Sequence, residues 1–433
     1  PVLMLTMMMP NPDSESSVRQ LHAEQGRVAA ALDRFEVRPQ QVDMACAVER
    51  AFWRSRHLVA EAGTGVGKSF AYLLPAIEHV CEQGGRALIS TYTITLQEQL
   101  IHKDIPILET CLSRDFSARL AKGRGNYLCK RRLAFALTRA ERLLGAYAAE
   151  LRMLAEWAAQ TTDGSLSDCS FVPRSTIWDK VKSEHGNCRG RKCPHFRDCF
   201  YWRARRALET ADIIVANHAL LFSDLVLKKD GYALLPDYHV VILDEAHTVE
   251  RVAEDHFGID VSYRRVKYVL DGLYSPRRRR GLLSGPKMNE MIDQVCDAHV
   301  LASSFFDQVH SWYQQNRGTS NGRCEKHVVE DCLSQPLSTL RRSLGKYIKG
   351  TKDEDEKLEF SRYVDMCKIL QQDLKDFLHQ THGDHVYWVD AESADLSGTR
   401  LKSAPINVGP YLSESLFEPF ASVILTSATL STG

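Results

Sequence analysis

One eight-residue stretch limits what this chain can fold into more than any other part of it. Ala62–Ser69 has the sequence Ala-Gly-Thr-Gly-Val-Gly-Lys-Ser, between a short apolar run at His57–Glu61 and a helical stretch that begins at Lys68. A glycine-rich loop between a strand and a helix is the context of a P-loop, which holds phosphates with backbone N–H groups and the helix dipole. The chain is therefore predicted to contain a parallel α/β nucleotide-binding sheet.

The sequence of this loop predicts the roles of its individual residues. Backbone groups of four residues would close around the phosphates of ATP: Gly63, Thr64, Gly65 and Gly67. Lys68 would reach the β- and γ-phosphates, and the Ser69 hydroxyl would bind Mg²⁺. A chance glycine-rich turn is the alternative, and the flanking strand and helix argue against it.

A second motif supplies the acids that a P-loop site needs. The β-branched run Val240–Leu243 predicts a buried central strand, and Asp244, Glu245, Ala246 and His247 follow it directly. An acidic pair at the end of such a strand lies beside the P-loop, at the carboxyl edge of the sheet. Asp244 would hold Mg²⁺ through water, Glu245 would position the attacking water, and His247 would sense the nucleotide state. A solvated turn is the alternative reading of Asp-Glu alone, but not of the two motifs together.

The rest of the chain predicts one α/β domain with two insertions. Ala87–Ser90, Ile213–Ala216 and Val423–Leu425 are expected to be further strands of the sheet. Helices are expected over 17–53, with an interruption at Arg38–Pro39, over Lys68–Cys81, near Leu96–Ile101, and over Leu133–Gln160. Between roughly 250 and 400 the sheet signal fades into helical, charged sequence.

Composition excludes several classes of protein. The 433 residues contain 55 basic and 55 acidic side chains, so any nucleic-acid surface must be local. Apolar runs are too short to span a membrane. Without an export signal, the 12 cysteines point to a reducing compartment, where metal binding is favoured over disulfides.

Several short motifs in a fixed order give the chain its resemblance to a family. Asp-Glu-Ala-His at 244–247 matches motif II of superfamily 2 helicases, and the chain resembles the DinG-type, XPD-like iron–sulfur DNA helicases. The remaining family motifs are the adenine-reading Q motif at Arg38–Met44, motif Ia at Ser90–Gln99, the run Asn217–Leu221, and motif III at Thr426–Thr429. The resemblance implies a RecA-like fold, a base contact from Gln41, and contacts to strand phosphates from Thr91, Thr93 and Gln97.

Four cysteines have the spacing of a metal site. Cys129, Cys188, Cys193 and Cys199 form the pattern C-x58-C-x4-C-x5-C, in which three close thiols and a distant one would staple an inserted segment. Spacing alone leaves a 4Fe–4S cluster, a structural zinc and free thiols open. The family resemblance favours the 4Fe–4S cluster, because a run like Gly123–Cys129 precedes the first ligand in that family.

Basic residues gather around these cysteines. His185–Arg206 has seven arginines and lysines against one acid, Asp198. Neutralisation of DNA phosphates would explain this concentration, and interleaved aromatics could stack on bases. The DNA-contact candidates are Arg124, Tyr127, Arg189 and Arg191. A solvated basic face with the aromatics packed inward is the alternative. Arg277–Arg280 is either a further DNA contact or a flexible charged loop, and Asp353–Glu356 is expected to be a solvated helix end.

By this resemblance the chain divides into five segments. A RecA-like motor domain would occupy 1–122, 205–250 and 405–433, an Fe–S insertion 123–204, and a helical arch insertion 251–404. The complete protein would use ATP to move 5′ to 3′ on single-stranded DNA and to unwind forks, D-loops or R-loops, which contain RNA–DNA hybrids. It would act as a cytoplasmic, nucleoid-associated bacterial monomer without membrane contact, and a single-stranded-DNA-binding protein could be its partner.

The chain is expected to stop before the second motor domain. It ends at Gly433, after motif III, so the arginines of motifs IV to VI would be absent, and 433 residues alone would bind nucleotide and DNA weakly without unwinding. Two rival classes stay open: a DinG-type ATPase fused to an exonuclease, and a non-enzymatic ATP- and DNA-binding module with structural zinc.

Overall fold

The computed structural model describes residues 38–63, 65–112, 114–140, 147–229, 231–284, 288–391 and 395–429. These residues form two compact units. The first comprises the described residues up to Lys122, Arg206–Val252 and those from Gly409 on; the second comprises Gly123–Arg205 and Ala253–Val408. Each unit is described by itself.

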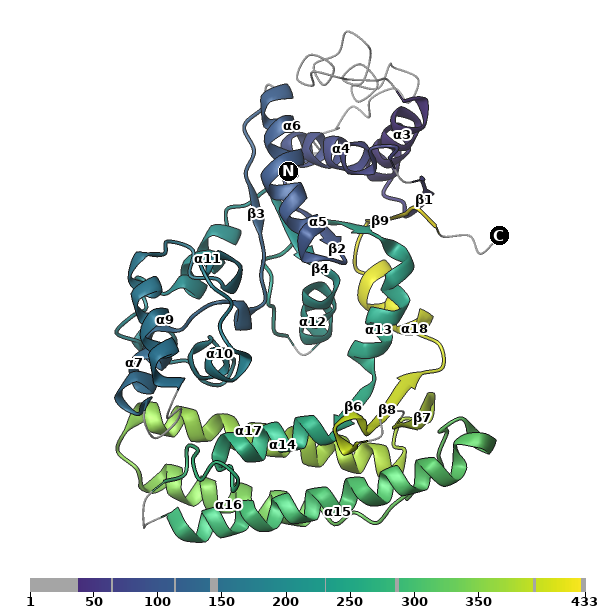
Figure 1. Ribbon diagram of the computed structural model, residues 1–433. Helices are drawn as coiled ribbons and strands as arrows, with labels where there is room; N and C mark the ends of the chain where they lie inside the picture. The colour runs from purple at the N-terminus through teal and green to yellow at the C-terminus, as the bar shows by residue number, and fades with distance from the viewer. Residues whose placement is uncertain are drawn as a thin grey trace, which may run out of the picture. The chain divides into compact units, whose positions relative to one another are not determined.

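The first unit is built on a parallel sheet, which Figure 1 shows with helices around it. The strands are β1 (Leu58–Glu61), β2 (Ala87–Thr91), β3 (Ala118–Leu120), β4 (Ile213–Asn217), β5 (Val240–Asp244) and β9 (Ser422–Ser427). Their order is β1-β9-β5-β2-β4-β3, and each neighbouring pair is parallel. Because β2 and β5 are buried along their whole length, they needed the near-continuous apolar runs seen in the sequence. The predicted α/β fold with a parallel sheet is confirmed.

Helices join and cover these strands. They are α3 (Pro39–Trp53), α4 (Lys68–Gln83), α5 (Ile94–Gln99), α6 (Ile105–Cys111), α12 (His218–Lys229), α13 (Val249–Phe257) and α18 (Gly409–Leu412), with π-helical turns at Leu100–Asp104 and Ser413–Phe417. α3 begins with Pro39 in its first turn, where the missing N–H costs no hydrogen bond. The predicted interruption at Arg38–Pro39 is therefore a helix start, and the expected helix before it lies outside the described residues.

The second unit contains a sheet that the sequence analysis missed. β6 (Ile259–Ser262), β8 (Arg400–Pro405) and β7 (His385–Asp390) pair antiparallel in that order. Alternate residues of each strand are buried. Such half-buried strands lack a continuous apolar run, and β6 lies far in sequence from its partner, so the sheet signal that fades between roughly 250 and 400 did not predict them.

The remaining elements of the second unit are helices. They are α7 (Lys130–Thr138), α9 (Ala148–Gln160), α10 (Ser175–Val181), α11 (Phe200–Leu208), α14 (Tyr263–Leu273), α15 (Asn289–Ser320), α16 (Ser334–Gly350) and α17 (Glu354–His379). Of the span Leu133–Gln160 expected to be helical, the described residues form α7, which ends at Thr138, and α9, which begins at Ala148.

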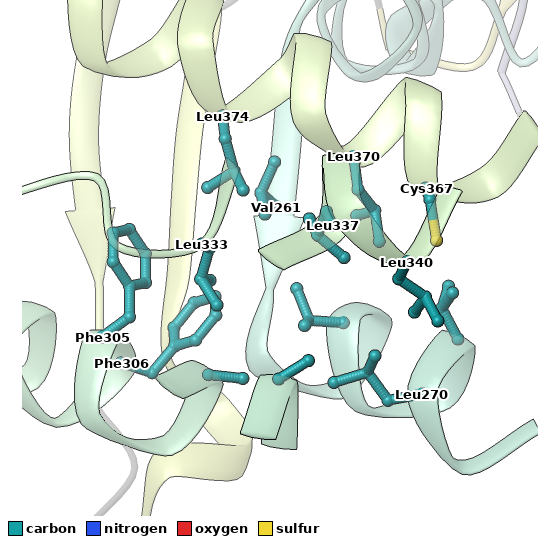
Figure 2. Packing of buried hydrophobic residues seen from close by; sticks show 14 of the residues in the cluster. Val261, Leu270, Phe305, Phe306, Leu333, Leu337, Leu340, Cys367, Leu370 and Leu374 are labelled. Atoms are coloured by element: carbon teal, nitrogen blue, oxygen red, sulfur yellow. The ribbon is translucent and has the colours of Figure 1, made fainter. Parts of the chain in front are cut away.

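One apolar core lies under the long helices of the second unit. Figure 2 shows Phe305 and Phe306 of α15, Leu337 and Leu340 of α16, and Leu370 and Leu374 of α17 pointing toward one another. A smaller core around Leu151, Leu154 and Trp178 lies among the helices that flank the cysteines. No helix among the described residues is long and apolar enough to cross a membrane.

Candidate functional site

The P-loop is held in shape from α3. Gly65 and Gly67 have φ values of 82° and 86°, in the left-handed region that favours glycine. The Gln41 side-chain amide donates to the Gly67 carbonyl at 2.9 Å, and Arg38 donates to the Gly65 carbonyl. A Cβ at Gly67 would lie 2.2 Å from Gln41 Nε2, so glycine is required there on two counts. Gln41 and the loop therefore form one unit; Gly63 lies in the same loop, and Thr64 lies outside the described residues.

The two charged motifs meet at the carboxyl edge of the sheet. Lys68 Nζ, at the start of α4, is 4.0 Å from Glu245 Oε1. Asp244 at the end of β5 is 5% exposed, and its pKa is raised by burial and by neighbouring Glu245. Glu245 has a φ of 55°, so the chain turns sharply after Asp244. Lys68, Asp244 and Glu245 thus converge, as a phosphate–Mg²⁺ site requires.

A buried tyrosine that the sequence analysis did not single out supports this edge. Tyr72, one turn along α4 from Ser69, is fully buried and donates from its hydroxyl to Asp244 Oδ2 at 3.1 Å. The other oxygen, Oδ1, accepts from the Glu245 backbone N–H at 3.0 Å. Burial and then Asp244 raise the pKa of Tyr72, while a hydrogen bond to the Ser69 side chain lowers it. Ser69, Tyr72 and Asp244 therefore share one polar cluster under the P-loop.

His247 links the acidic motif to β9. Its Nδ1 lies 2.8 Å from Ser427 Oγ and 3.4 Å from Glu245 Oε2. Ser427 belongs to the run that the sequence analysis assigned to motif III, so a change at Glu245 can reach that run through one side chain.

His218 is a second functional candidate that sequence reasoning missed. At the start of α12 it is 1% exposed, and its Nδ1 lies 2.7 Å from Ser90 Oγ of β2. Burial lowers the pKa of the ring to about 4, against the opposing effect of the Asp244 backbone, so the ring is neutral at pH 7. Its Nε2 is buried without a well-aligned hydrogen bond. A neutral imidazole thus joins β2 to the backbone at Asp244; the quoted run Asn217–Leu221 was its sequence signal.

The expected DNA contacts of motif Ia differ in exposure. Thr91 is fully buried and donates to the Thr93 carbonyl at 3.2 Å, and Gln97 is 4% exposed. Thr93 is exposed and caps α5 by accepting from the Leu96 N–H at 3.2 Å. In this structure, the Thr93 side chain is accessible to a nucleic-acid strand, whereas the side chains of Thr91 and Gln97 are buried.

The four predicted cysteine ligands lie in the second unit, where Cys199 interacts electrostatically with each of the other three thiols. The thiols of Cys188 and Cys193 raise the pKa of Cys199, after the larger effect of burial, and Cys199 acts similarly on Cys129. The Gly190 N–H donates to Cys188 Sγ at 3.3 Å; this bond and the Arg124 charge outweigh burial and lower the pKa of Cys188. Within the described ranges, no three metal-ligating side chains converge on one ion. The donor chemistry, thiols with N–H and guanidinium neighbours, fits thiolate ligation of a cluster.

The aromatic residues near the cysteines pack inward, which agrees with the alternative of a solvated basic face over packed aromatics. Tyr127 is 3% exposed, Phe200 is 2% exposed, and both belong to the smaller core. Arg124 lies over the ring of Tyr201, 4.4 Å from its centroid, and its Nε donates to Ser183 Oγ at 3.0 Å. The Tyr127 ring therefore offers no free stacking surface in this conformation.

The basic residues of this region divide into paired and exposed groups. Arg189 Nη2 lies 2.9 Å from Asp355 of α17, and Lys130 pairs with Asp198 at 2.6 Å. Arg191 and Lys192 are exposed. Of the predicted DNA contacts around the cysteines, Arg191 thus has an exposed side chain.

A buried charge network, also missed from the sequence, joins α7 to α17. Arg132 is fully buried and donates from Nε and Nη2 to the two carboxylate oxygens of Glu359 at 2.8 and 3.1 Å. Glu184 lies 3.0 Å from Arg132 and 2.7 Å from Arg362. Arg131 lies 3.0 Å from Asp355, so the acidic run 353–356 is ion-paired at a helix start rather than merely solvated. Asp353 accepts from the Glu356 N–H at 3.2 Å and caps α17.

Sequence comparisons give this arrangement a family context. A DEAD/DEAH box helicase family model matches residues 41–124, and the DEAD_2 model matches residues 175–266. The ATP-dependent DNA helicase YoaA of Escherichia coli K12 is 38% identical over 94% of this chain and 62% of its own length. The ATP-dependent helicase DinG of Mycobacterium tuberculosis H37Rv is 36% identical over 50% of this chain and 35% of its own length.

The match to these relatives is partial on their side. The chain spans about three fifths of the length of the two YoaA relatives it matches, 62% and 64%. The Bacillus subtilis protein named 3′-5′ exonuclease DinG is 26% identical over 92% of this chain and 46% of its own length. Among solved structures, an XPD helicase matches with a TM-score of 0.47 at 15% identity, over 92% of this chain and 59% of the other. The family assignment rests on the sequence matches.

Proposed function

We propose that this chain, which is similar to the YoaA- and DinG-type helicases, carries the ATP-binding site of an ATP-dependent DNA helicase. The observation that carries this proposal is the meeting of Lys68, Asp244 and Glu245 at one sheet edge, next to a P-loop with two left-handed glycines.

The residues suggest how ATP would be held and cleaved. The N–H groups of the loop and Lys68 would hold the phosphates, while Ser69 and, through water, Asp244 would hold Mg²⁺. Glu245 would orient the attacking water. Gln41 would contact the adenine while bonded to Gly67, which joins base recognition to the shape of the loop. The absence of unwinding by this chain alone stays a prediction.

The DNA substrate and the direction of movement are proposed from the family. The complete protein would translocate 5′ to 3′ on single-stranded DNA and open forks, D-loops and R-loops. It would act as a monomer in the bacterial cytoplasm and could cooperate with a single-stranded-DNA-binding protein. Exposed Arg191 and Lys192 in the second unit and, separately, the exposed cap residue Thr93 in the first unit support contacts to DNA.

The segments of the second unit would be the two insertions of a motor domain. We assign 123–204 to an Fe–S insertion and 251–404 to an arch, with the motor domain in 1–122, 205–250 and 405–433. Cys129, Cys188, Cys193 and Cys199 would hold a 4Fe–4S cluster. The cluster would supply folding energy to a segment with only a small apolar core of its own.

Metal content separates the cluster from the zinc alternative. Iron, sulfide and zinc per chain would be measured after anaerobic purification, together with the visible absorption spectrum. We expect about four irons and four sulfides, and loss of both in Cys188→Ser, with Cys169→Ser as the control at a thiol outside the set. One zinc per chain without colour would refute the cluster and support a structural zinc.

Strand separation tests the motor itself. The complete protein, with ATP and Mg²⁺, is offered matched forks whose single-stranded tail is either 5′ or 3′. We expect opening of the 5′-tailed fork, and none by Glu245→Gln, which should still bind ATP. Normal ATP binding without opening of either fork would favour the non-enzymatic ATP- and DNA-binding module.

A further inference from the structure

A run of four arginines forms a closed turn in the second unit. Ser275 and Arg280 form an isolated antiparallel bridge, in which the Ser275 N–H donates to the Arg280 carbonyl at 2.8 Å. Pro276, Arg277, Arg278 and Arg279 form the turn between them, and Arg279 has a φ of 49°. The run that the sequence left open as a flexible loop is thus a short turn fixed at both ends.

The segment after the turn anchors it to the core. The Leu282 N–H donates to Gly272 and the Leu283 N–H to Leu273, at 3.2 and 2.9 Å, so the chain returns along the end of α14. Leu282 and Leu283 are 4% and 0% exposed. At Gly281 an added Cβ would lie 2.2 Å from the Leu273 carbonyl oxygen, so only glycine allows this close approach. The base of the turn is therefore built with core-like contacts.

The arginines of the turn face solvent without acidic partners. Arg277, Arg278 and Arg279 are exposed, and the part of the chain that the structure describes gives them no ion pair. The acid nearest in sequence, Asp271, is already engaged by Lys267 at 3.1 Å and approached by His299 at 3.5 Å. Three like charges held close together repel one another, and a polyanion would relieve that repulsion.

We propose that the turn Pro276–Arg279 is a second nucleic-acid contact, which binds the phosphate backbone without reading sequence. This inference rests on the proposed function, since it presumes a DNA substrate. Guanidinium groups suit phosphate because each can donate two parallel N–H bonds to it. The turn does not include Arg191, and none of the residues proposed for the ATP site or the cluster belongs to it.

The test compares two triple variants of the full chain that each lose three positive charges. One is Arg277→Gln/Arg278→Gln/Arg279→Gln. The control is Arg342→Gln/Lys346→Gln/Lys349→Gln, at three exposed positions of α16 in the same unit. DNA affinity is measured by fluorescence anisotropy from 0.05 to 0.5 M salt, with single-stranded and duplex oligonucleotides. Melting curves verify that both variants fold.

The slope of log affinity against log salt gives the result. If the turn contacts three phosphates, its variant should lose about 2 from the slope on single strands, at roughly 0.7 per phosphate, and about 2.7 on duplex, at roughly 0.9. That corresponds to binding on the order of 100-fold weaker at 0.1 M salt, with the control near wild type. Loss on only one DNA form identifies which strand state the turn contacts.

Two results would overturn the inference. If the turn variant keeps the wild-type slope, the arginines do not contact phosphates, while the proposed function stands. If both triple variants lose the same slope, net charge rather than the turn is responsible. Should the wild-type chain bind neither oligonucleotide, the inference and the DNA part of the proposed function both fail.

Discussion

Replacing Glu359 by glutamine should destabilise the second unit strongly. Glu359 is buried and faces the fully buried Arg132 with two hydrogen bonds of 2.8 and 3.1 Å, and Arg131 lies 3.8 Å away. The substitution keeps the shape of the side chain but removes the negative charge that accepts both of these hydrogen bonds from Arg132. Glu184 would then be left to balance Arg132 and Arg362 together.

The size of the effect follows from burial. Removing one partner of a buried ion pair costs about 3–5 kcal/mol, because the remaining charge loses its compensation. For a unit of this size, each kcal/mol moves the melting temperature by roughly 2–4 °C, so a fall on the order of 10 °C is expected. Glu354→Gln is the control on the same helix, since Glu354 is exposed and pairs with nearby Lys357. It should leave the melting temperature unchanged.

Calorimetry measures the transition, and hydrogen exchange assigns it. Peptides from α7 and α17 should lose protection together in Glu359→Gln, while peptides from β2 and β5 keep theirs. A variant that melts within 2 °C of wild type, with α7 and α17 still protected, would refute the claim that this network holds the second unit together.

The same carboxylate predicts a pH dependence. Burial raises the pKa of Glu359, but the charge of Arg132 and its hydrogen bonds lower that pKa by more. The pKa of Glu359 in the folded state therefore lies below the usual value. A depressed pKa gives stability that is present above the unfolded value and lost as pH falls through the folded one. Wild type should therefore lose stability below about pH 4, and Glu359→Gln should lose less over that range. Parallel acid profiles would contradict this.

Three changes test the nucleotide site. Gly67→Ala should weaken ATP binding at least tenfold, roughly, because its Cβ meets Gln41 at a positive φ; unchanged affinity by calorimetric titration would contradict that contact. His218→Asn places an amide near the Nδ1 position, which lies 2.7 Å from Ser90 Oγ, and should keep ATP turnover within a few-fold, whereas His218→Gln should lower kcat about tenfold at unchanged nucleotide affinity. Equal kcat in both would remove His218 from the mechanism. Tyr72→Phe removes the hydrogen bond from Tyr72 to Asp244 and should raise the Mg²⁺ concentration needed for half-maximal ATP binding about fivefold. As the pH falls, Mg²⁺-dependent ATP binding should be lost at a higher pH than an ordinary aspartate would give, because the pKa of Asp244 is raised.

The sequence could predict the parts of the site that local pattern determines. The P-loop and the acidic pair stand at the ends of apolar runs, so their shared sheet edge follows from parallel strand topology alone. The predicted strand Val240–Leu243 extends by one residue in the structure, to Asp244. These motifs need only their immediate neighbours to be recognised.

Tertiary partners could not be predicted in the same way. Arg132 and Glu359 are 227 positions apart, and nothing local marks either as buried. Tyr72 and His218 resemble ordinary helix residues until β5 is placed beside Tyr72 and β2 beside His218. Tyr127 was assigned to a DNA contact because aromatics lay among arginines, whereas the structure buries its ring. Charge and aromatic patterns therefore suggested surfaces that only packing could assign.

The most direct test of the central claim is a calorimetric titration of the chain with ATP and Mg²⁺. The account predicts one site per chain in wild type, retained in Glu245→Gln, and lost in Lys68→Ala, since Lys68 alone brings a positive charge from α4 to the phosphates beside Glu245. Equal binding by Lys68→Ala and wild type would contradict the assignment of this sheet edge as the ATP site.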